Sequence, residues 1–251
     1  MPGTPRELFT YVTWALLALL ALGQAGTTSS SMAPSEVIGV HAGAGAELQG
    51  KVYVALGDSI SAGRFATVSG TTFPSDVAAK LGMRLDLIAR SGTKAAWGAQ
   101  QVAAVNAAQP ALVTIELGTN DVGFNTPVDA FSAQYEAIVS GVSALDRQVL
   151  CVGSWLPSAA FDQIIQAACE RHGGTFVSLQ GFYAVNAFHA ADGGPSYLGR
   201  ADWFHPGDEG HAAIAAAIVS ALGAGPPPLL VTPGATPAPS PVAGVLRTHP
   251  Y

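Results

Sequence analysis

Short apolar runs alternate with helical patterns along the middle of the chain. Five runs are rich in aliphatic or β-branched residues, as is typical of buried strands: Lys51–Leu56, Leu85–Ala89, Ala111–Leu117, Val149–Ser154 and Thr175–Leu179. Helical patterns separate and follow these runs near Phe73–Leu81, Ala99–Ala108, Pro127–Leu145, Ala159–His172 and Gly210–Leu222. This order predicts right-handed βαβ units, and therefore a five-stranded parallel sheet with helices on both faces.

Both ends of the chain differ from this pattern. Leu8–Gly23 is almost wholly apolar and small residues follow it, which indicates a signal peptide over residues 1–25. A retained N-terminal membrane anchor is the alternative. Residues 26–49 are predicted to be a flexible leader, and residues 225–251, with eight of the 17 prolines, a disordered tail. We therefore expect one folded domain over residues 50–224 of a secreted or extracytoplasmic protein, whose termini also allow association with a membrane or a cell wall.

The chain carries few charges, and they are mainly acidic. Only 11% of the 251 residues are charged, the formal net charge is −6, and no cluster of Lys and Arg occurs. Nucleic-acid binding requires a basic surface, so nucleic acid is excluded as a partner. An HExxH pattern and a cysteine cluster are also missing, and His205, Asp208 and His211 alone form a weak metal pattern. We expect a monomer that needs no metal or other cofactor.

Polar side chains suited to acyl transfer lie at the ends of the predicted strands, where parallel sheets bind their ligands. Ser59 follows the first strand in the sequence GDSI, and His205 precedes the last helix in the sequence DWFHP. His205 can accept the Ser59 proton on Nε2, while Asp202, three residues earlier, can hold its Nδ1–H. These three residues are therefore a candidate catalytic triad.

Candidate donors for a developing oxyanion follow the second and third strands. Gly92 has no side chain, so a substrate can approach its amide closely. The side-chain amide of Asn120, in the sequence GTND, and the backbone amide of Ser59 complete the set. The sequence thus predicts a complete acyl-transfer site.

The four blocks resemble those of the SGNH hydrolases, a branch of the GDSL esterases and lipases. The matching blocks are Ser59 in GDSI, Gly92 in SGT, Asn120 in GTND and His205 in DWFHP, in this order. The resemblance spans about Lys51–Leu222. It implies a flavodoxin-like three-layer α/β/α sandwich, a triad of Ser59, His205 and Asp202, and an oxyanion hole of Ser59, Gly92 and Asn120. The chain departs from the family in its second block, where Arg90 and Ser91 replace a frequent asparagine upstream of the glycine.

Several residues near the site also have purely structural interpretations. Ser59 can cap the helix that follows it. Glu116, inside an apolar strand, is either a buried, hydrogen-bonded acid or a polar residue at the floor of the pocket. Trp155 and Trp203 are predicted to bind substrate as pocket walls, with core packing as the alternative.

Cys151 and Cys169 are the only cysteines of the chain. They fall on the fourth strand and late in the helix after it. Export would place them in an oxidising compartment, which favours a disulfide, and two buried free thiols are the alternative.

The predicted function is a secreted serine esterase that hydrolyses carboxylic esters through an acyl-enzyme intermediate. We expect the long segment Gln180–Phe204 to form an aromatic wall beside a shallow groove for short acyl groups, such as acetyl. The substrate would be a small-molecule or polysaccharide ester. A lipase or lysophospholipase for longer acyl chains and a non-catalytic glycan-binding module on the same scaffold remain the alternatives.

Overall fold

The computed structural model of the chain describes residues 47–144 and 146–223. Its main sheet has five parallel strands in the order β2-β1-β3-β4-β5. The strands are β1 (Val52–Gly57), β2 (Arg84–Ala89), β3 (Leu112–Glu116), β4 (Gln148–Val152) and β5 (Thr175–Val177). Each lies on one of the five predicted apolar runs. The predicted signal peptide or anchor, most of the leader and the Pro-rich tail lie outside the described residues.

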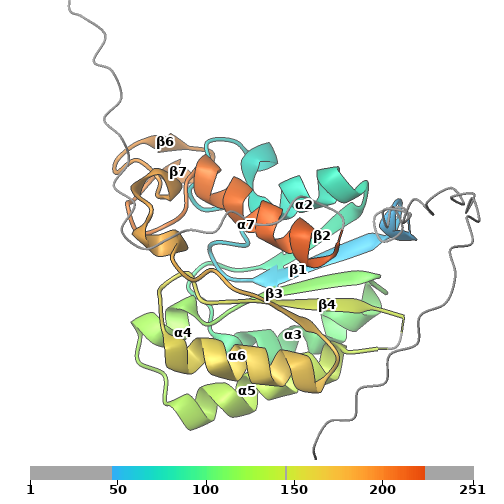
Figure 1. Cartoon of the computed structure of the whole chain (residues 1–251). Helices are drawn as coiled ribbons and strands as arrows, with labels where there is room; N and C mark the ends of the chain where they lie inside the picture. The colour runs from blue at the N-terminus through green and yellow to red at the C-terminus, as the bar shows by residue number, and fades with distance from the viewer. Residues whose placement is uncertain (1–46, 145, 224–251) are drawn as a thin grey trace, which may run out of the picture. The chain divides into compact units, whose positions relative to one another are not determined.

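Helices cover both faces of this sheet (Figure 1). One face carries α2 (Phe73–Leu81) and α7 (Asp208–Ala221), and the other carries α3 (Ala95–Ala107), α5 (Val128–Val142) and α6 (Ala159–Arg171). The predicted three-layer α/β/α sandwich is therefore confirmed. The structure also contains elements that were not predicted: α4 (Thr119–Gly123), three short 3-10 helices, η1 (Ser69–Thr71), η2 (Phe182–Ala184) and η3 (Asn186–Phe188), and the hairpin of β6 (Pro195–Ser196) and β7 (Gly199–Arg200).

Side-chain alternation along the strands divides the core into two layers. On β1, Tyr53 and Ala55 belong to the core under α2 and α7, whereas Val54 and Leu56 belong to the core over α3, α5 and α6. All four residues are fully buried. A central strand that is buried on both faces needs apolar residues at every position, which explains why it appears in the sequence as a continuous apolar run.

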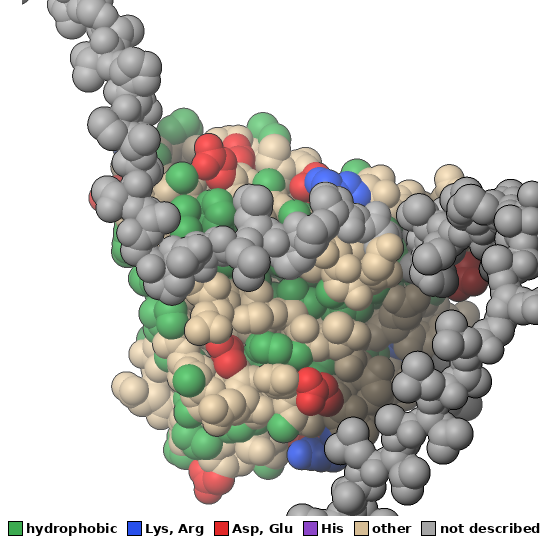
Figure 2. All heavy atoms as spheres, viewed as in Figure 1, with side chains coloured by type: hydrophobic (Ala, Val, Ile, Leu, Met, Phe, Trp, Pro, Cys, Tyr) green, Lys and Arg blue, Asp and Glu red, His purple; other side chains and the backbone are tan. Residues whose placement is uncertain are grey.

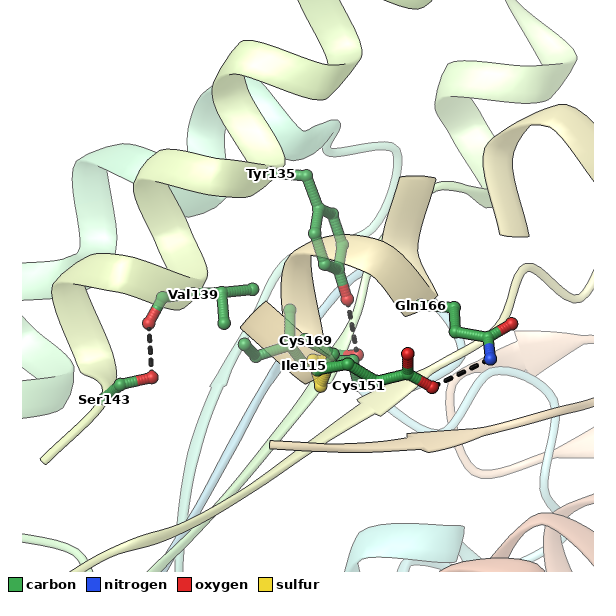
Figure 3. The surroundings of a disulfide bond; sticks show 8 residues. Ile115, Tyr135, Val139, Ser143, Cys151, Gln166 and Cys169 are labelled. Carbon is green, nitrogen blue, oxygen red and sulfur yellow. Dashed lines mark hydrogen bonds between the residues drawn. A yellow bond between two sulfur atoms is a disulfide. The ribbon is translucent and has the colours of Figure 1, made fainter. Parts of the chain in front are cut away.

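A disulfide joins the sheet to the helix layer below it. Cys151 on β4 is bonded to Cys169 on α6, as Figure 3 shows, and the two residues are 18 positions apart in the sequence. Both cysteines are fully buried. Tyr135 of α5 points toward the same region and donates from its hydroxyl to the carbonyl of Ile115, at 3.5 Å. The bridge therefore ties α6 to a strand in the middle of the α3–α5–α6 core.

The surface is weakly charged. On the face that Figure 2 shows, acidic and basic side chains form small separate patches between larger apolar and uncharged areas. Within residues 47–144 and 146–223, no helix has both the length and the apolar character that crossing a bilayer requires.

Candidate active site

The candidate residues meet where the strand order reverses. The chain passes from β1 to β2 on one side of β1, and then returns to β3 on the other side of β1. Ser59 follows β1 and Asn120 follows β3, and the two strand ends are in register because Gly57 pairs with Glu116. A reversal of this kind opens a crevice at the carboxyl ends of the strands, and this crevice is the usual ligand site of open α/β sheets.

Ser59, His205 and Asp202 form a continuous chain of hydrogen bonds. Ser59 Oγ lies 3.0 Å from His205 Nε2, and His205 Nδ1 lies 2.7 Å from Asp202 Oδ1. Ser59 and His205 are largely buried, whereas 49% of the Asp202 side chain is exposed. With a hydrogen on Nδ1, the imidazole presents an unprotonated Nε2 to the serine hydroxyl, which is the arrangement a general base requires.

The loop that carries His205 is fixed by several contacts. Asp202 Oδ1 also accepts a hydrogen bond from the backbone amide of His205, at 3.1 Å. The rings of Phe65 and Phe204 pack edge-on against the imidazole, with centroids 5.1 and 5.2 Å away. The indole Nε1–H of Trp155 donates to the carbonyl of Phe204 at 2.7 Å. These contacts hold the imidazole in one orientation.

Gly57, at the end of β1, allows the Ser59 loop to turn tightly against β3. A Cβ atom at this position would lie 1.9 Å from Ser61 Oγ and 2.7 Å from the backbone oxygen of Glu116. No side chain can be accommodated at that distance, so the turn requires glycine.

The three candidate oxyanion donors are differently placed. The backbone amides of Ser59 and Gly92 donate to no protein acceptor in the described part of the chain. Gly92 has a φ of +78°, which favours glycine, and open space where a Cβ would project. In contrast, Asn120 Nδ2 already makes two hydrogen bonds, to Asp58 Oδ2 at 2.9 Å and to the carbonyl of Thr93 at 3.0 Å.

Two carboxyl groups are buried directly beneath the Ser59 loop. Asp58 accepts from the Ile60 amide at 2.9 Å, and Glu116 Oε2 accepts from the amide and the hydroxyl of Ser61 at 3.1 and 2.9 Å. Burial raises the pKa of Asp58 from 3.8 to about 7. Burial, and then the charge of Asp58, raises the pKa of Glu116 well above its usual range. Of the two interpretations of Glu116, the structure favours the buried acid, since Glu116 does not line the cavity.

A cavity of ≈ 390 Å³ opens over these residues. Ser59, Gly92, Asn120 and His205 all line it. The rest of its wall includes Arg64, Phe124 and Phe204. A nucleophile, a base and polar hydrogen donors therefore face one space that can hold a small ester.

The two predicted substrate-binding tryptophans do not line this cavity. Trp155 is fully buried in the α2–α7 core, so its predicted contact with substrate is wrong. Trp203 is 47% exposed, but its ring stacks on His189 with centroids 4.0 Å apart and stays outside the cavity wall. The predicted aromatic wall from Gln180–Phe204 is reduced to Phe204. Phe182, Tyr183, Phe188 and Trp203 pack on one another or on Trp155 and His189, and the hydroxyl of Tyr197 donates to the carbonyl of Ala62.

Comparisons with known proteins agree with this geometry. The sequence matches the GDSL-like lipase/acylhydrolase family over residues 55–213. No curated protein shows a significant match. Among solved structures, TesA is 23% identical with a TM-score of 0.56, and the match covers 68% of this chain and 98% of that one. The esterase EstA from Pseudoalteromonas sp. is 17% identical with a TM-score of 0.55, and the match covers 68% and 96%.

A two-domain esterase, CEX, described as active on acetylated mannans, is 21% identical with a TM-score of 0.57. The match covers 78% of this chain and 55% of that larger protein. At these identities the structures establish a shared fold, whereas the family match spans more than half of the sequence. The chain therefore belongs to the GDSL-like lipase/acylhydrolase family and is a carboxylic ester hydrolase.

Proposed function

We propose that this protein is a serine esterase in which Ser59 is the nucleophile, His205 the general base and acid, and Asp202 the residue that orients His205. The observation that carries this proposal is the unbroken chain from Ser59 Oγ to Asp202 Oδ1, with links of 3.0 and 2.7 Å, at a cavity wall. A glycan-binding module without turnover would not need this alignment.

The reaction has two acyl-transfer steps. Ser59 Oγ attacks the ester carbonyl while its proton passes to His205 Nε2, and the Nδ1–H bond to Asp202 stabilises the imidazolium that forms. The tetrahedral intermediate collapses when His205 returns the proton to the departing alcohol, which leaves the acyl group on Ser59. Water then attacks the acyl-enzyme with His205 again acting as base, so one carboxylic acid is released and the serine hydroxyl is restored.

The amides of Ser59 and Gly92 and the side chain of Asn120 are the proposed donors to the oxyanion. The two backbone amides have no competing acceptor among the described residues, so they can bind an oxyanion without first breaking a protein hydrogen bond. Such preorganised donors lower the barrier because they need no reorientation when negative charge develops.

The proposed substrates are esters of short acyl groups, such as acetyl. A cavity of ≈ 390 Å³ lies at the small end of the range for ligand sites, and it must hold parts of both the acyl and the alcohol portions. The structurally similar CEX esterase is active on acetylated mannans, which makes acetylated polysaccharides a reasonable class to test.

We also propose that the enzyme acts outside the cytoplasm. The apolar stretch Leu8–Gly23 has the length and small-residue boundary of a signal peptide. The disulfide between Cys151 and Cys169 supports this location, because disulfides persist in oxidising compartments. Mass spectrometry of the protein exported by its native host would test the proposal, and a purely cytoplasmic chain that begins at Met1 would contradict it.

The catalytic assignment is tested by labelling with a fluorophosphonate. The unsubstituted protein should take up one label, on the peptide that contains Ser59, and Ser59→Ala should take up none. Ser69→Ala is a matched control because Ser69 is an exposed serine near the same loop. Labelling that persists in Ser59→Ala would refute the nucleophile assignment.

Turnover of p-nitrophenyl acetate provides a second test of the triad. Ser59→Ala and His205→Ala should each lower kcat by several orders of magnitude, and the double variant should lose little more, because the residues act as one unit. Additive losses would contradict this assignment.

A series of p-nitrophenyl esters of increasing chain length, run beside acetylated xylan, tests the acyl preference. A maximum at about eight carbons or more, without acetate release from xylan, would favour the lipase alternative.

A further inference from the structure

We propose that the cavity beside Ser59 selects esters that carry an anionic group, a carboxylate or a phosphate, through the guanidinium group of Arg64. This inference rests on the proposed esterase function and adds the charge of the substrate to it. Arg64 lines the cavity together with Ser59 and His205, and no acidic residue lines it.

Arg64 has no counter-ion in the described part of the chain. None of the ion pairs there includes it, and its side chain makes no hydrogen bond with another described residue. The guanidinium carbon lies 5.2 Å from the centroid of the Phe65 ring, and this ring packs edge-on against His205. A cation–π contact holds the guanidinium near the catalytic base without neutralising its charge.

Two further basic residues adjoin residues that line the cavity. Arg90 is exposed immediately before Ser91 and Gly92, and it takes part in no ion pair among the described residues. Lys94 Nζ lies 5.4 Å from the centroid of Phe124, which lines the cavity. The chain has only 11 Lys and Arg residues and a net charge of −6, so Arg64 in the cavity wall and Lys94 beside Phe124 make this site more basic than the chain as a whole.

None of the nearby carboxyl groups of the described residues pairs with Arg64. Asp202 Oδ1 accepts hydrogen bonds from Nδ1 and the backbone amide of His205, and Asp202 forms no ion pair with Arg64. Asp58 is buried under the Ser59 loop. Asp121 is also buried, and burial raises its pKa, although hydrogen bonds with Ala95 and Thr126 and then the charge of Lys94 partly offset this effect. Lys94 is thus partly balanced by Asp121, whereas Arg64 has no such partner, and we therefore assign the selectivity to Arg64.

An anionic group on the substrate would interact with Arg64 at close range. A charge pair a few ångströms apart at a half-exposed site changes an affinity by about fivefold to tenfold, and added salt weakens it. We therefore expect the anionic member of a matched ester pair to have the higher kcat/KM. This advantage should shrink between 0.05 M and 0.5 M NaCl.

Two substrate pairs locate the anionic group. In the first, 4-acetoxybenzoate is compared with its neutral methyl ester, so the charge is on the alcohol portion. In the second, mono-p-nitrophenyl succinate is compared with p-nitrophenyl pentanoate, so the charge is on the acyl portion. Each pair is measured with the unsubstituted protein, Arg64→Gln, Arg64→Lys and Arg84→Gln. Arg84 is an exposed arginine at the start of β2, at the opposite end of the sheet from Ser59.

Arg64→Gln should lower the anionic-to-neutral ratio of kcat/KM about fivefold to tenfold in at least one pair. Arg64→Lys should retain part of the ratio, and Arg84→Gln all of it. Ratios that are the same in the unsubstituted protein and Arg64→Gln, in both pairs, would overturn the proposal. Comparing the anionic-to-neutral ratio of kcat/KM between variants cancels the intrinsic reactivity of each ester and any general loss of folded protein.

The neutral esters report on the proposed esterase function separately. If the unsubstituted protein and Ser59→Ala hydrolyse them equally, the proposed function fails. Calorimetric titration of Ser59→Ala with 4-acetoxybenzoate and its methyl ester then still tests Arg64. The inference is supported if Ser59→Ala binds the anion more tightly than the methyl ester and if adding Arg64→Gln abolishes this difference. Equal binding of both compounds would overturn it.

Discussion

Replacing Asp58 by Asn should change how the stability of the protein depends on pH. Asp58 is fully buried, and its carboxyl accepts hydrogen bonds from the Ile60 amide and from Asn120 Nδ2. These bonds do not compensate for the loss of water, so burial raises the pKa of Asp58 to about 7. The folded protein therefore binds the Asp58 proton more tightly than the unfolded chain does.

The sign and size of the effect follow from proton linkage. A carboxyl group with a raised pKa in the folded state contributes stability that is fully present below its unfolded pKa and is lost as the pH rises through its folded pKa. For Asp58 this window runs from 3.8 to about 7, and the change corresponds to about 4 kcal/mol of unfolding free energy at most. Removing the charge of Asp58 also removes one cause of the raised pKa of Glu116. A lower pKa of Glu116 reduces the stability that the protein loses as the pH rises, so this second effect adds to the first.

Asp58→Asn carries a cost that does not depend on pH. The new amide would place an N–H group opposite Asn120 Nδ2, where a carboxylate oxygen now accepts, and an unsatisfied buried donor costs about 1–3 kcal/mol. The variant should therefore be less stable than the unsubstituted protein near pH 4.5. Between pH 4.5 and pH 8.5 its stability should rise by about 3 kcal/mol relative to that of the unsubstituted protein.

The measurement is urea unfolding followed by tryptophan fluorescence at several pH values between 4.5 and 8.5, with the disulfide kept oxidised. Asp192→Asn, at an exposed position, is the matched control and should follow the unsubstituted protein at every pH. A stability difference between Asp58→Asn and the unsubstituted protein that stays constant across this range would refute the reasoning, because Asp58 would then titrate alike in the folded and unfolded states.

Two further predictions concern the site and the core. Asn120→Ala should lower kcat for p-nitrophenyl acetate by about 10² to 10³ with little change in KM, since the Asn120 side-chain amide would stabilise charge that exists only in the transition state. A change in KM alone would contradict the oxyanion role. The double variant Cys151→Ala/Cys169→Ala should lose about 3 kcal/mol of stability, because the unfolded chain regains the freedom of a loop closed over 18 positions, while kcat stays the same. An unchanged melting temperature in this variant would contradict the second prediction.

The order of the elements could be predicted from the sequence, because the strands are buried on both faces and leave a strong apolar signal. Helix boundaries depended on contacts that a local pattern does not contain. The helix predicted from Ala99 begins at Ala95, where the carboxyl group of Asp121, from the short helix α4, accepts a hydrogen bond from the Ala95 amide at 2.9 Å. A cap supplied by a residue that is distant in the sequence cannot be recognised from neighbouring residues.

The residues of the candidate triad could be predicted because the order of strands and helices could be predicted. Ser59 and His205 lie at a strand end and before a helix, and topology brings such positions together. The pocket walls could not be predicted, because they depend on which way each aromatic ring turns. Trp155 faces the core and Trp203 stacks on His189, whereas Phe124, directly after the unpredicted helix α4, lines the cavity.

The hydrogen bonds of Asn120 explain why its proposed role should affect kcat more than KM. One Nδ2 hydrogen is held by the Asp58 carboxyl and the other by the neutral carbonyl of Thr93. When Asp58 is ionised, its bond is the stronger of the two, because a charged acceptor strengthens a hydrogen bond. The Thr93 bond is therefore the one that a substrate can replace. The neutral carbonyl of a bound ester is no better an acceptor than Thr93, so the exchange gains nothing in the ground state. An oxyanion is a better acceptor, and the exchange becomes favourable only as the transition state forms, which is the condition for an interaction to raise kcat.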